Sequence, residues 1–351
     1  MSGFRRDHRD HNGSPGTAPA TPAPRRTPGR AALRPVFALA SILTVALGCD
    51  KARELAGGGA EAAEPAAAAL LDLSSRPEIL FQVFGERNDA RMIPIAVIQG
   101  GRLEPIVLAS AGWKQFDAMY GKSGTSYTLF RDGRSAGTAV VRQGMWEKPN
   151  EPLYSLPSCE LMIPLARVRL DTKMKIAFTV EAFASNAQLG RATSSPGMSA
   201  RDVEAAARQV GEAAAQRGRI SSGVLESLSL SADAIEVRSG APPVVVASFT
   251  DPKADDKASS GGKTASIFAI AEQGEDGGYQ IAYSHIVNGD ASDAEYRRYI
   301  DHLDFDGDGT DEIVLEGWDS SGTSFLSILR ADGAKWTEMF RSRPEWCLDR
   351  G

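Results

Sequence analysis

Residues Asp304 to Ile313 read DFDGDGTDEI, and Val314 and Leu315 continue the segment as an apolar run. Acidic side chains recur at every second position before the turn, and Gly309 allows the chain to bend sharply. The oxygen atoms expected to face one another belong to the side chains of Asp304, Asp306, Asp308 and Glu312 and to the carbonyl of Thr310. Calcium takes roughly six to eight oxygen ligands, which an alternating acidic loop can supply. The sequence therefore predicts a calcium (Ca2+) site in a loop that leads into a β-strand.

The loop differs from a calcium-binding EF-hand. An EF-hand has glutamate at its twelfth position and lies between helices, whereas this segment has Leu315 there and runs directly into a strand. The segment instead resembles the calcium loops of FG-GAP and VCBS repeats, the blades of integrin-α-type β-propellers. The resemblance covers roughly residues 299–340 and implies that the five residues named above bind calcium. Because the chain has one such loop and no Phe-Gly-Gly-Ala-Pro sequence, we expect one blade-like unit rather than a full propeller.

Hairpin signals recur on both sides of this loop. Glycine-containing turns separate apolar runs at Gly100-Gly101, Asp132-Gly133, Gly277-Gly278 and Asp332-Gly333. Such pairs are the strongest short-range indicators of antiparallel hairpins, because both central positions of the turn favour positive φ. We therefore expect a mainly β fold of hairpin-rich antiparallel sheets rather than a parallel sheet.

One helix is predicted between these strands. Ser199 and Asp202 form a capping pair, small apolar residues then recur at helical spacing, and Gly218 ends the pattern. We expect this helix to lie on a sheet or to bridge two domains. The predicted organisation is an N-terminal β domain (72–195), a bridging helix (196–219) and a C-terminal β domain (220–351), with one continuous sheet system as the alternative. The polar residues 251–263 are expected to form a loop.

The first 48 residues have the composition of an export signal. They contain seven arginines and two aspartates, and an apolar run of residues 36–47 precedes Cys49. Ala46-Leu47-Gly48-Cys49 resembles the lipobox of bacterial lipoproteins, which implies cleavage before Cys49 and its lipidation. Residues 49–71, rich in Ala, Gly and Glu, are then a flexible tether at the membrane. The expected location is the bacterial cell envelope, facing the periplasm or the cell surface.

Two further cysteines remain if Cys49 carries the lipid. Cys159 and Cys347 would form one disulfide in an oxidising compartment, the alternative being two unrelated buried thiols. Without the leader the chain carries 32 basic and 43 acidic residues, a net charge of −11. Nucleic acid is therefore not an expected partner.

Catalytic motifs are weak in this chain. After the leader, His285 and His302 are the available histidines, so a Ser-His-Asp triad or a histidine-based zinc site has little support. Our leading hypothesis is a non-enzymatic, calcium-stabilised β scaffold that binds an unknown protein or glycan partner. The alternative is a lipid-anchored hydrolase of polysaccharide or peptide that uses paired carboxylates.

Overall fold

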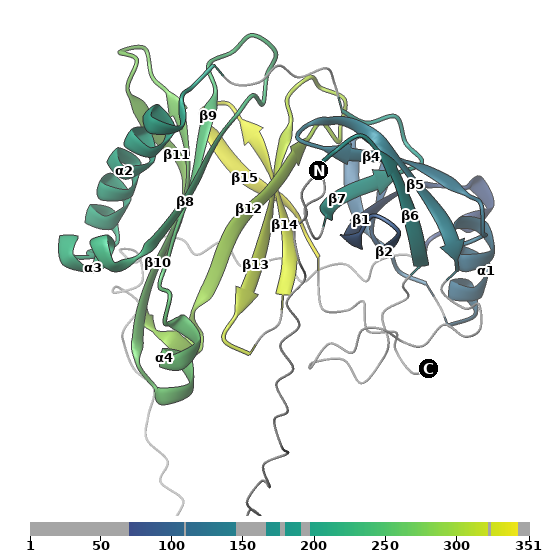
Figure 1. Ribbon diagram of the computed structural model, residues 1–351, viewed down its shortest axis with the longest axis horizontal. Coiled ribbons are helices and arrows are strands. Elements are labelled where there is room, and N and C mark those ends of the chain that lie inside the picture. The colour runs from purple at the N-terminus through teal and green to yellow at the C-terminus, as the bar shows by residue number, and fades with distance from the viewer. Residues whose placement is uncertain are drawn as a thin grey trace, which may run out of the picture. The chain divides into compact units, whose positions relative to one another are not determined.

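The structure, a computed structural model, describes residues 70–108, 110–144, 166–175, 180–190, 197–321 and 324–342 (Figure 1). These residues form three antiparallel sheets with few helices, which confirms the predicted mainly β fold. None of the helices in these ranges is both long enough and apolar enough to cross a bilayer. Cys49, Cys159 and Cys347, and with them the predicted lipid anchor and disulfide, lie outside the described residues.

The first sheet closes on itself. Strands β1, β7, β4, β5, β6 and β2 pair in that order, and β1 also pairs with β2, so these six strands form a barrel that β3 extends beyond β2. Their bounds are β1 (Glu78–Glu86), β2 (Asp89–Gln99), β3 (Arg102–Pro105), β4 (Ser126–Arg131), β5 (Arg134–Gln143), β6 (Ala166–Thr172) and β7 (Val180–Ser185). A short 3-10 turn, Leu73–Ser75, precedes β1. Inside the barrel, alternate residues of β1 such as Phe81 pack with Tyr127 of β4.

A helix that the sequence analysis did not predict completes the barrel core. Helix α1 (Ser110–Tyr120) places Trp113, Phe116 and Tyr120 in contact with the barrel interior. Phe116 lies 6.4 Å from Phe81 and 4.6 Å from Tyr120, measured between ring centroids. These three residues occupy positions i, i+3 and i+7, the spacing of one helix face.

The two remaining sheets are four-stranded meanders of consecutive strands. The second sheet contains β8 (Ser229–Ile235), β9 (Val244–Thr250), β10 (Lys263–Gln273) and β11 (Tyr279–Asp290). The third contains β12 (Glu295–Leu303), β13 (Glu312–Asp319), β14 (Ser324–Asp332) and β15 (Lys335–Arg341). A 3-10 turn, Ala291–Asp293, connects them.

Each of the central apolar strands contributes side chains to two hydrophobic cores, because successive side chains point to opposite faces of a sheet. On β10, Ile267 packs toward α2 whereas Phe268 packs toward the third sheet. On β13, Leu315 packs toward the second sheet whereas Val314 packs toward the barrel. The second and third sheets therefore share one core, and the third sheet shares another with the barrel.

The predicted long helix is present as α2 (Ala200–Arg217). The side chain of Ser199 caps it by accepting the N–H of Asp202 at 3.2 Å. Instead of bridging two domains, α2 packs its small residues on the face of the second sheet, where Gly211 leaves room for the ring of Phe249. A short helix, α3 (Ser222–Ser227), follows it.

The sequence analysis expected residues 251–263 to form a loop, but part of this segment is helical. It contains α4 (Ala254–Ser260), which ends at Gly261 with a left-handed φ of 70°. The Lys257 ammonium pairs with the Asp251 carboxylate at 2.5 Å, and that carboxylate also accepts the hydroxyl of Thr264. These contacts connect the segment to β10 and explain how its polar residues are held in a defined structure.

Candidate metal centre

The acidic loop connects β12 and β13 of the third sheet. The last pair of this ladder joins Leu303 to Glu312, so residues 304–311 must reverse the chain between them. Gly307 and Gly309 adopt φ of 77° and 86°, a left-handed conformation that other residues rarely adopt. The two carboxylate oxygens of Asp304 accept their N–H groups at 2.7 and 3.1 Å. The loop is therefore a tight turn wrapped around the side chain of Asp304.

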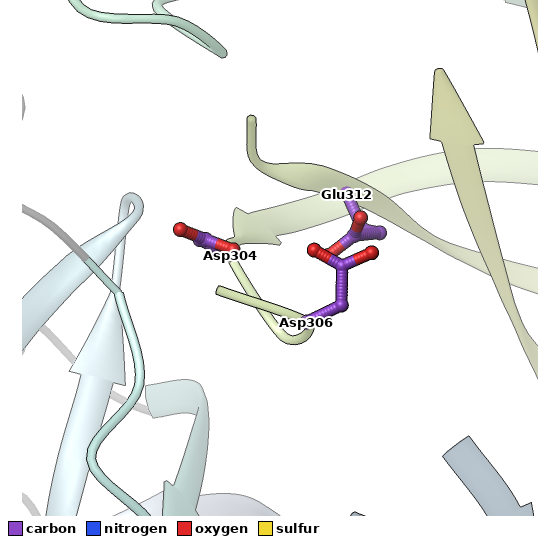
Figure 2. A group of neighbouring side chains, drawn as sticks. All are labelled: Asp304, Asp306 and Glu312. Carbon is purple, nitrogen blue, oxygen red and sulfur yellow. The ribbon is translucent and has the colours of Figure 1, made fainter. Parts of the chain in front are cut away.

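Three of the predicted ligands come together in this turn. Oxygen atoms of Asp304, Asp306 and Glu312 lie within 4.8 Å of one another. Asp304 and Glu312 are buried, and Asp306 is partly buried. Figure 2 shows the carboxylates of Asp306 and Glu312 directed toward each other, with Asp304 beside them on the loop. The alternating acidic spacing thus becomes a convergent cluster of oxygens.

The electrostatic state of this cluster is unfavourable without a counter-charge. Burial raises the pKa of Glu312 to about 8, and the charges of Asp306, Asp304 and Asp308 add to the rise, against the lowering effect of the Phe305 N–H. Burial, supported by the neighbouring aspartates, also raises the pKa of Asp306. The guanidinium of Arg330 lies 3.9 Å from Asp306 and is half exposed, so it offsets the charge only in part. Asp306 and Glu312 therefore bind protons more readily than ordinary carboxylates do.

One carboxylate oxygen of Glu312 accepts a hydrogen bond from the part of the protein that the structure describes, and the other does not. Its Oε2 accepts the backbone N–H of Phe305 at 2.9 Å, so the side chain reaches back across its own loop. Its Oε1 is buried and has no hydrogen-bond partner among the described residues. A buried acceptor oxygen without a hydrogen bond lowers the stability of the folded state by roughly 1 to 3 kcal/mol, unless another group interacts with it. A cation between the three carboxylates would supply that compensation.

The other two predicted ligands occupy different positions. Asp308 lies on the exposed side of the loop, where its Oδ1 accepts the N–H of Thr310 at 2.7 Å. The hydroxyl of Thr310 accepts the Nε–H of Arg238 at 3.2 Å, and residues 238 and 310 form an isolated β-bridge. Neither belongs to the group of three converging side chains.

The surroundings of the loop include contacts that sequence reasoning missed. Gly101, in the β2–β3 turn, lies against Asp306, and a Cβ atom at Gly101 would come within 3.1 Å of the Asp306 Cβ. On the other side of the loop the buried His302 lies 3.7 Å from the Asp311 carboxylate through its Nε2. The His302 Nδ1 lies 2.7 Å from the hydroxyl of Tyr299. The register that pairs Leu303 with Glu312 is the signal that could have placed His302 near Asp311.

The chemistry of the cluster is that of a hard-cation site. Its donors are carboxylate oxygens, which suit calcium or magnesium, and no described histidine or cysteine belongs to the group. Calcium tolerates irregular oxygen cages, whereas magnesium requires near-octahedral geometry at shorter distances. The donor set therefore fits a hard divalent cation, either calcium or magnesium.

No protein-family model, no curated protein and no solved structure matches this chain. The function of the loop is therefore interpreted from its own geometry and chemistry.

Proposed function

We propose that this protein is a calcium-stabilised β scaffold of the bacterial cell envelope, anchored through Cys49, which binds a partner rather than catalysing a reaction. The observation that carries the metal part is the buried Oε1 of Glu312, which lacks a hydrogen-bond partner among the described residues, on a side chain whose carboxylate converges with those of Asp304 and Asp306. Asp304, Asp306 and Glu312 would hold the ion, and Asp308 and the Thr310 carbonyl are close enough in sequence to complete the cage. The envelope location rests on the leader and on the lipobox resemblance.

A structural role for the ion follows from the position of the loop. The loop joins the first two strands of the third sheet, and that sheet contributes to the cores on both of its faces. An ion that binds only the folded state stabilises it by about 2.7 kcal/mol at a hundredfold excess over its dissociation constant. Calcium would therefore hold the packing of the third sheet between the second sheet and the barrel.

The hydrolase hypothesis has less support from the described residues. Enzymes of that class need paired carboxylates that face a substrate across a cleft. Asp301, Asp306 and Glu312 have raised pKa values but do not line the large groove beside α2 and β8. Asp233, whose pKa is also raised by burial, does line it. Among the described carboxyl groups with a raised pKa, Asp233 alone lies beside the groove, whereas a hydrolase of this class needs a facing pair.

Thermal melting of the purified protein tests the metal part. We expect calcium to raise the melting midpoint by roughly 5 °C or more over the chelated protein, given about 2 to 4 °C per kcal/mol for a chain of this size. Magnesium at the same concentration should give a smaller shift. An identical midpoint with calcium and with chelator would rule out a stabilising ion. Incorporation of a labelled fatty acid, lost in Cys49→Ser, tests the anchor separately.

A further inference from the structure

A groove is lined by residues of helices α2 and α3 and of strand β8 in the second sheet. Figure 1 shows the two helices beside this sheet. The volume of the groove is about 1160 Å³. Apolar side chains form much of its wall, namely Met198, Val203, Ile220, Leu225, Leu228, Leu230 and Phe249. Several of these remain partly exposed, among them Leu225, Leu228 and Leu230. The groove therefore leaves apolar surface open to solvent next to a folded core.

Strand β8 borders this groove as the last strand of its sheet. The strand order is β11-β10-β9-β8, so within the described residues β8 has one strand neighbour, β9. An edge strand presents unpaired N–H and C=O groups to any extended segment that aligns with it. Along β8 the residues alternate, with Leu230 and Ala232 half-buried and Ser231 and Asp233 exposed. A strand added at this edge would place every second side chain against the apolar wall.

The charges around the groove select for a cationic occupant. Three glutamates of the helices line it, Glu204, Glu212 and Glu226, against the guanidinium of Arg208. Asp233 adds a carboxylate at the β8 border, where it also lies near Arg131. Arg208 is already paired with Glu204 at 2.8 Å. A partner that brings lysine or arginine would be attracted, and a like-charged partner would be repelled. A second copy of this chain would bring the same acidic rim into contact with itself.

The acidic loop and β8 are connected through the backbone. After β8 the chain passes through Val237, whose carbonyl accepts the N–H of Asp311 at 2.8 Å. Arg238 then pairs with Thr310 of the loop. Because Asp311 and Thr310 adjoin Glu312, an ordered loop supports the C-terminal end of β8. The metal centre and the edge of the groove are thus parts of one continuous arrangement.

We propose that this groove binds an extended segment of a partner protein in which lysine or arginine alternates with apolar residues, and that the segment adds to the edge of β8 as a fifth strand. The proposal deepens the proposed function and rests on it, because it names the surface through which the scaffold would bind. Backbone pairing would supply affinity, the apolar wall would select alternate side chains, and the acidic rim would select the charge.

Fluorescence anisotropy with the full chain tests the proposal. The probe is a labelled octapeptide of alternating lysine and valine, and the controls are its glutamate–valine counterpart and a version interrupted by a central proline. We expect the lysine probe to bind roughly tenfold or more tightly than either control. Its affinity should fall as salt concentration rises, because the rim charges are exposed.

Two variants of β8 locate the binding site. Leu230→Lys places a positive charge in the apolar wall, and we expect it to weaken probe binding by roughly tenfold or more. Ser231→Lys adds the same charge at the next, exposed position, and should leave affinity within roughly twofold. Glu212 and Glu226 are exposed, so we expect the double variant Glu212→Gln, Glu226→Gln to fold normally and to bind the probe more weakly, which preserves the test if Leu230→Lys fails to fold.

The outcomes separate this proposal from the function on which it rests. Equal binding of the lysine and glutamate probes, no binding of either, or equal losses in Leu230→Lys and Ser231→Lys would overturn the groove assignment. A dimer that depends on Leu230, with no peptide binding, would assign the edge to a second copy instead. Melting with and without chelator in the same samples reports on the metal centre alone. A calcium shift without peptide binding would overturn the groove proposal and leave the scaffold standing.

Discussion

The carboxylate of Asp301 on β12 accepts the backbone N–H of Asp132 in the β4–β5 turn at 2.8 Å, across 169 positions of sequence. The same oxygen accepts the N–H of His302 at 2.8 Å. Its other oxygen lies 4.0 Å from the Nε of Arg131 and has no hydrogen-bond partner among the described residues. Burial raises the pKa of Asp301 to about 7. One buried carboxyl group therefore joins the barrel to the third sheet.

This carboxyl group should make stability depend on pH. Because the pKa of Asp301 is higher in the folded state than its ordinary 3.8, the folded protein binds the proton more tightly than the unfolded chain. Its contribution is fully present below about pH 4 and is lost as pH rises toward 7. We expect urea unfolding to show the free energy of unfolding of Asp301→Asn changing less over this range than that of the wild type. Parallel curves for the two proteins would contradict the assignment.

Glu312 should show a similar dependence that calcium removes. In chelator, the raised pKa of Glu312 predicts that the free energy of unfolding falls as pH rises from about 4.5 to 8. A bound cation favours the ionised carboxylate, so calcium should suppress this fall. Glu312→Gln, which keeps the acceptor for Phe305, should be more stable than the wild type in chelator at pH 8 and should lose most of the calcium shift.

Asp308→Asn provides the comparison for Glu312→Gln. Asp308 is exposed, and its carboxylate bonds within the loop, so this change should remove less of the calcium-dependent shift than Glu312→Gln does. Both melting midpoints are measured with calcium and with chelator. A larger loss in Asp308→Asn would move the ion toward the exposed side of the loop.

The β2–β3 turn offers a steric test of the acidic loop. Gly101→Ala would bring a Cβ atom within 3.1 Å of Asp306, at a φ of 72° that alanine disfavours. Gly100→Ala meets no atom within 4 Å at a φ of 57°, so it carries the backbone strain alone. We expect roughly 1 to 2 kcal/mol of destabilisation for Gly100→Ala and more for Gly101→Ala. Calcium affinity, measured by titration calorimetry, should fall only in Gly101→Ala.

The contact between α2 and the second sheet can be tested in the same manner. A Cβ atom at Gly211 would lie 2.3 Å from the ring of Phe249, so Gly211→Ala should destabilise the protein by roughly 1 to 3 kcal/mol. Gly223 lies in α3 with no atom within 4 Å of the added Cβ. Gly223→Ala should therefore leave stability unchanged or raise it by up to about 1 kcal/mol. Urea unfolding distinguishes the two variants.

Local signals predicted much of this fold. The turn at Asp132-Gly133 has φ of 53° and 71°, and the turn at Gly100-Gly101 has φ of 57° and 72°, as expected for hairpins whose central residues need positive φ. Helix α2 begins at the expected cap because Ser199 and Asp202 are only three residues apart in sequence. Such features depend on a few neighbouring residues, so one sequence is sufficient to find them.

Long-range features could not be predicted in this way. Closure of the barrel depends on pairs such as Leu80 with Ser185, which no local pattern encodes. In the metal centre, the spacing identified Asp304, Asp306 and Glu312, whereas the approach of Gly101 to Asp306 arises only when the β2–β3 hairpin packs on the loop. Helix α1 is different, because the spacing of Trp113, Phe116 and Tyr120 was a readable helical signal that the sequence analysis did not use.

The order of strands in the barrel also has a consequence for biogenesis. β1 meets β2 across a short turn, but its other neighbour, β7, begins only at Val180. Because the N-terminal part of a chain is synthesised first, one edge of β1 stays unpaired until about a hundred further residues have followed. An unpaired strand edge can pair with other chains. The meanders, whose neighbours are consecutive, have no such delay. Protection of the nascent chain from aggregation would matter most in the interval before β7 is available to pair.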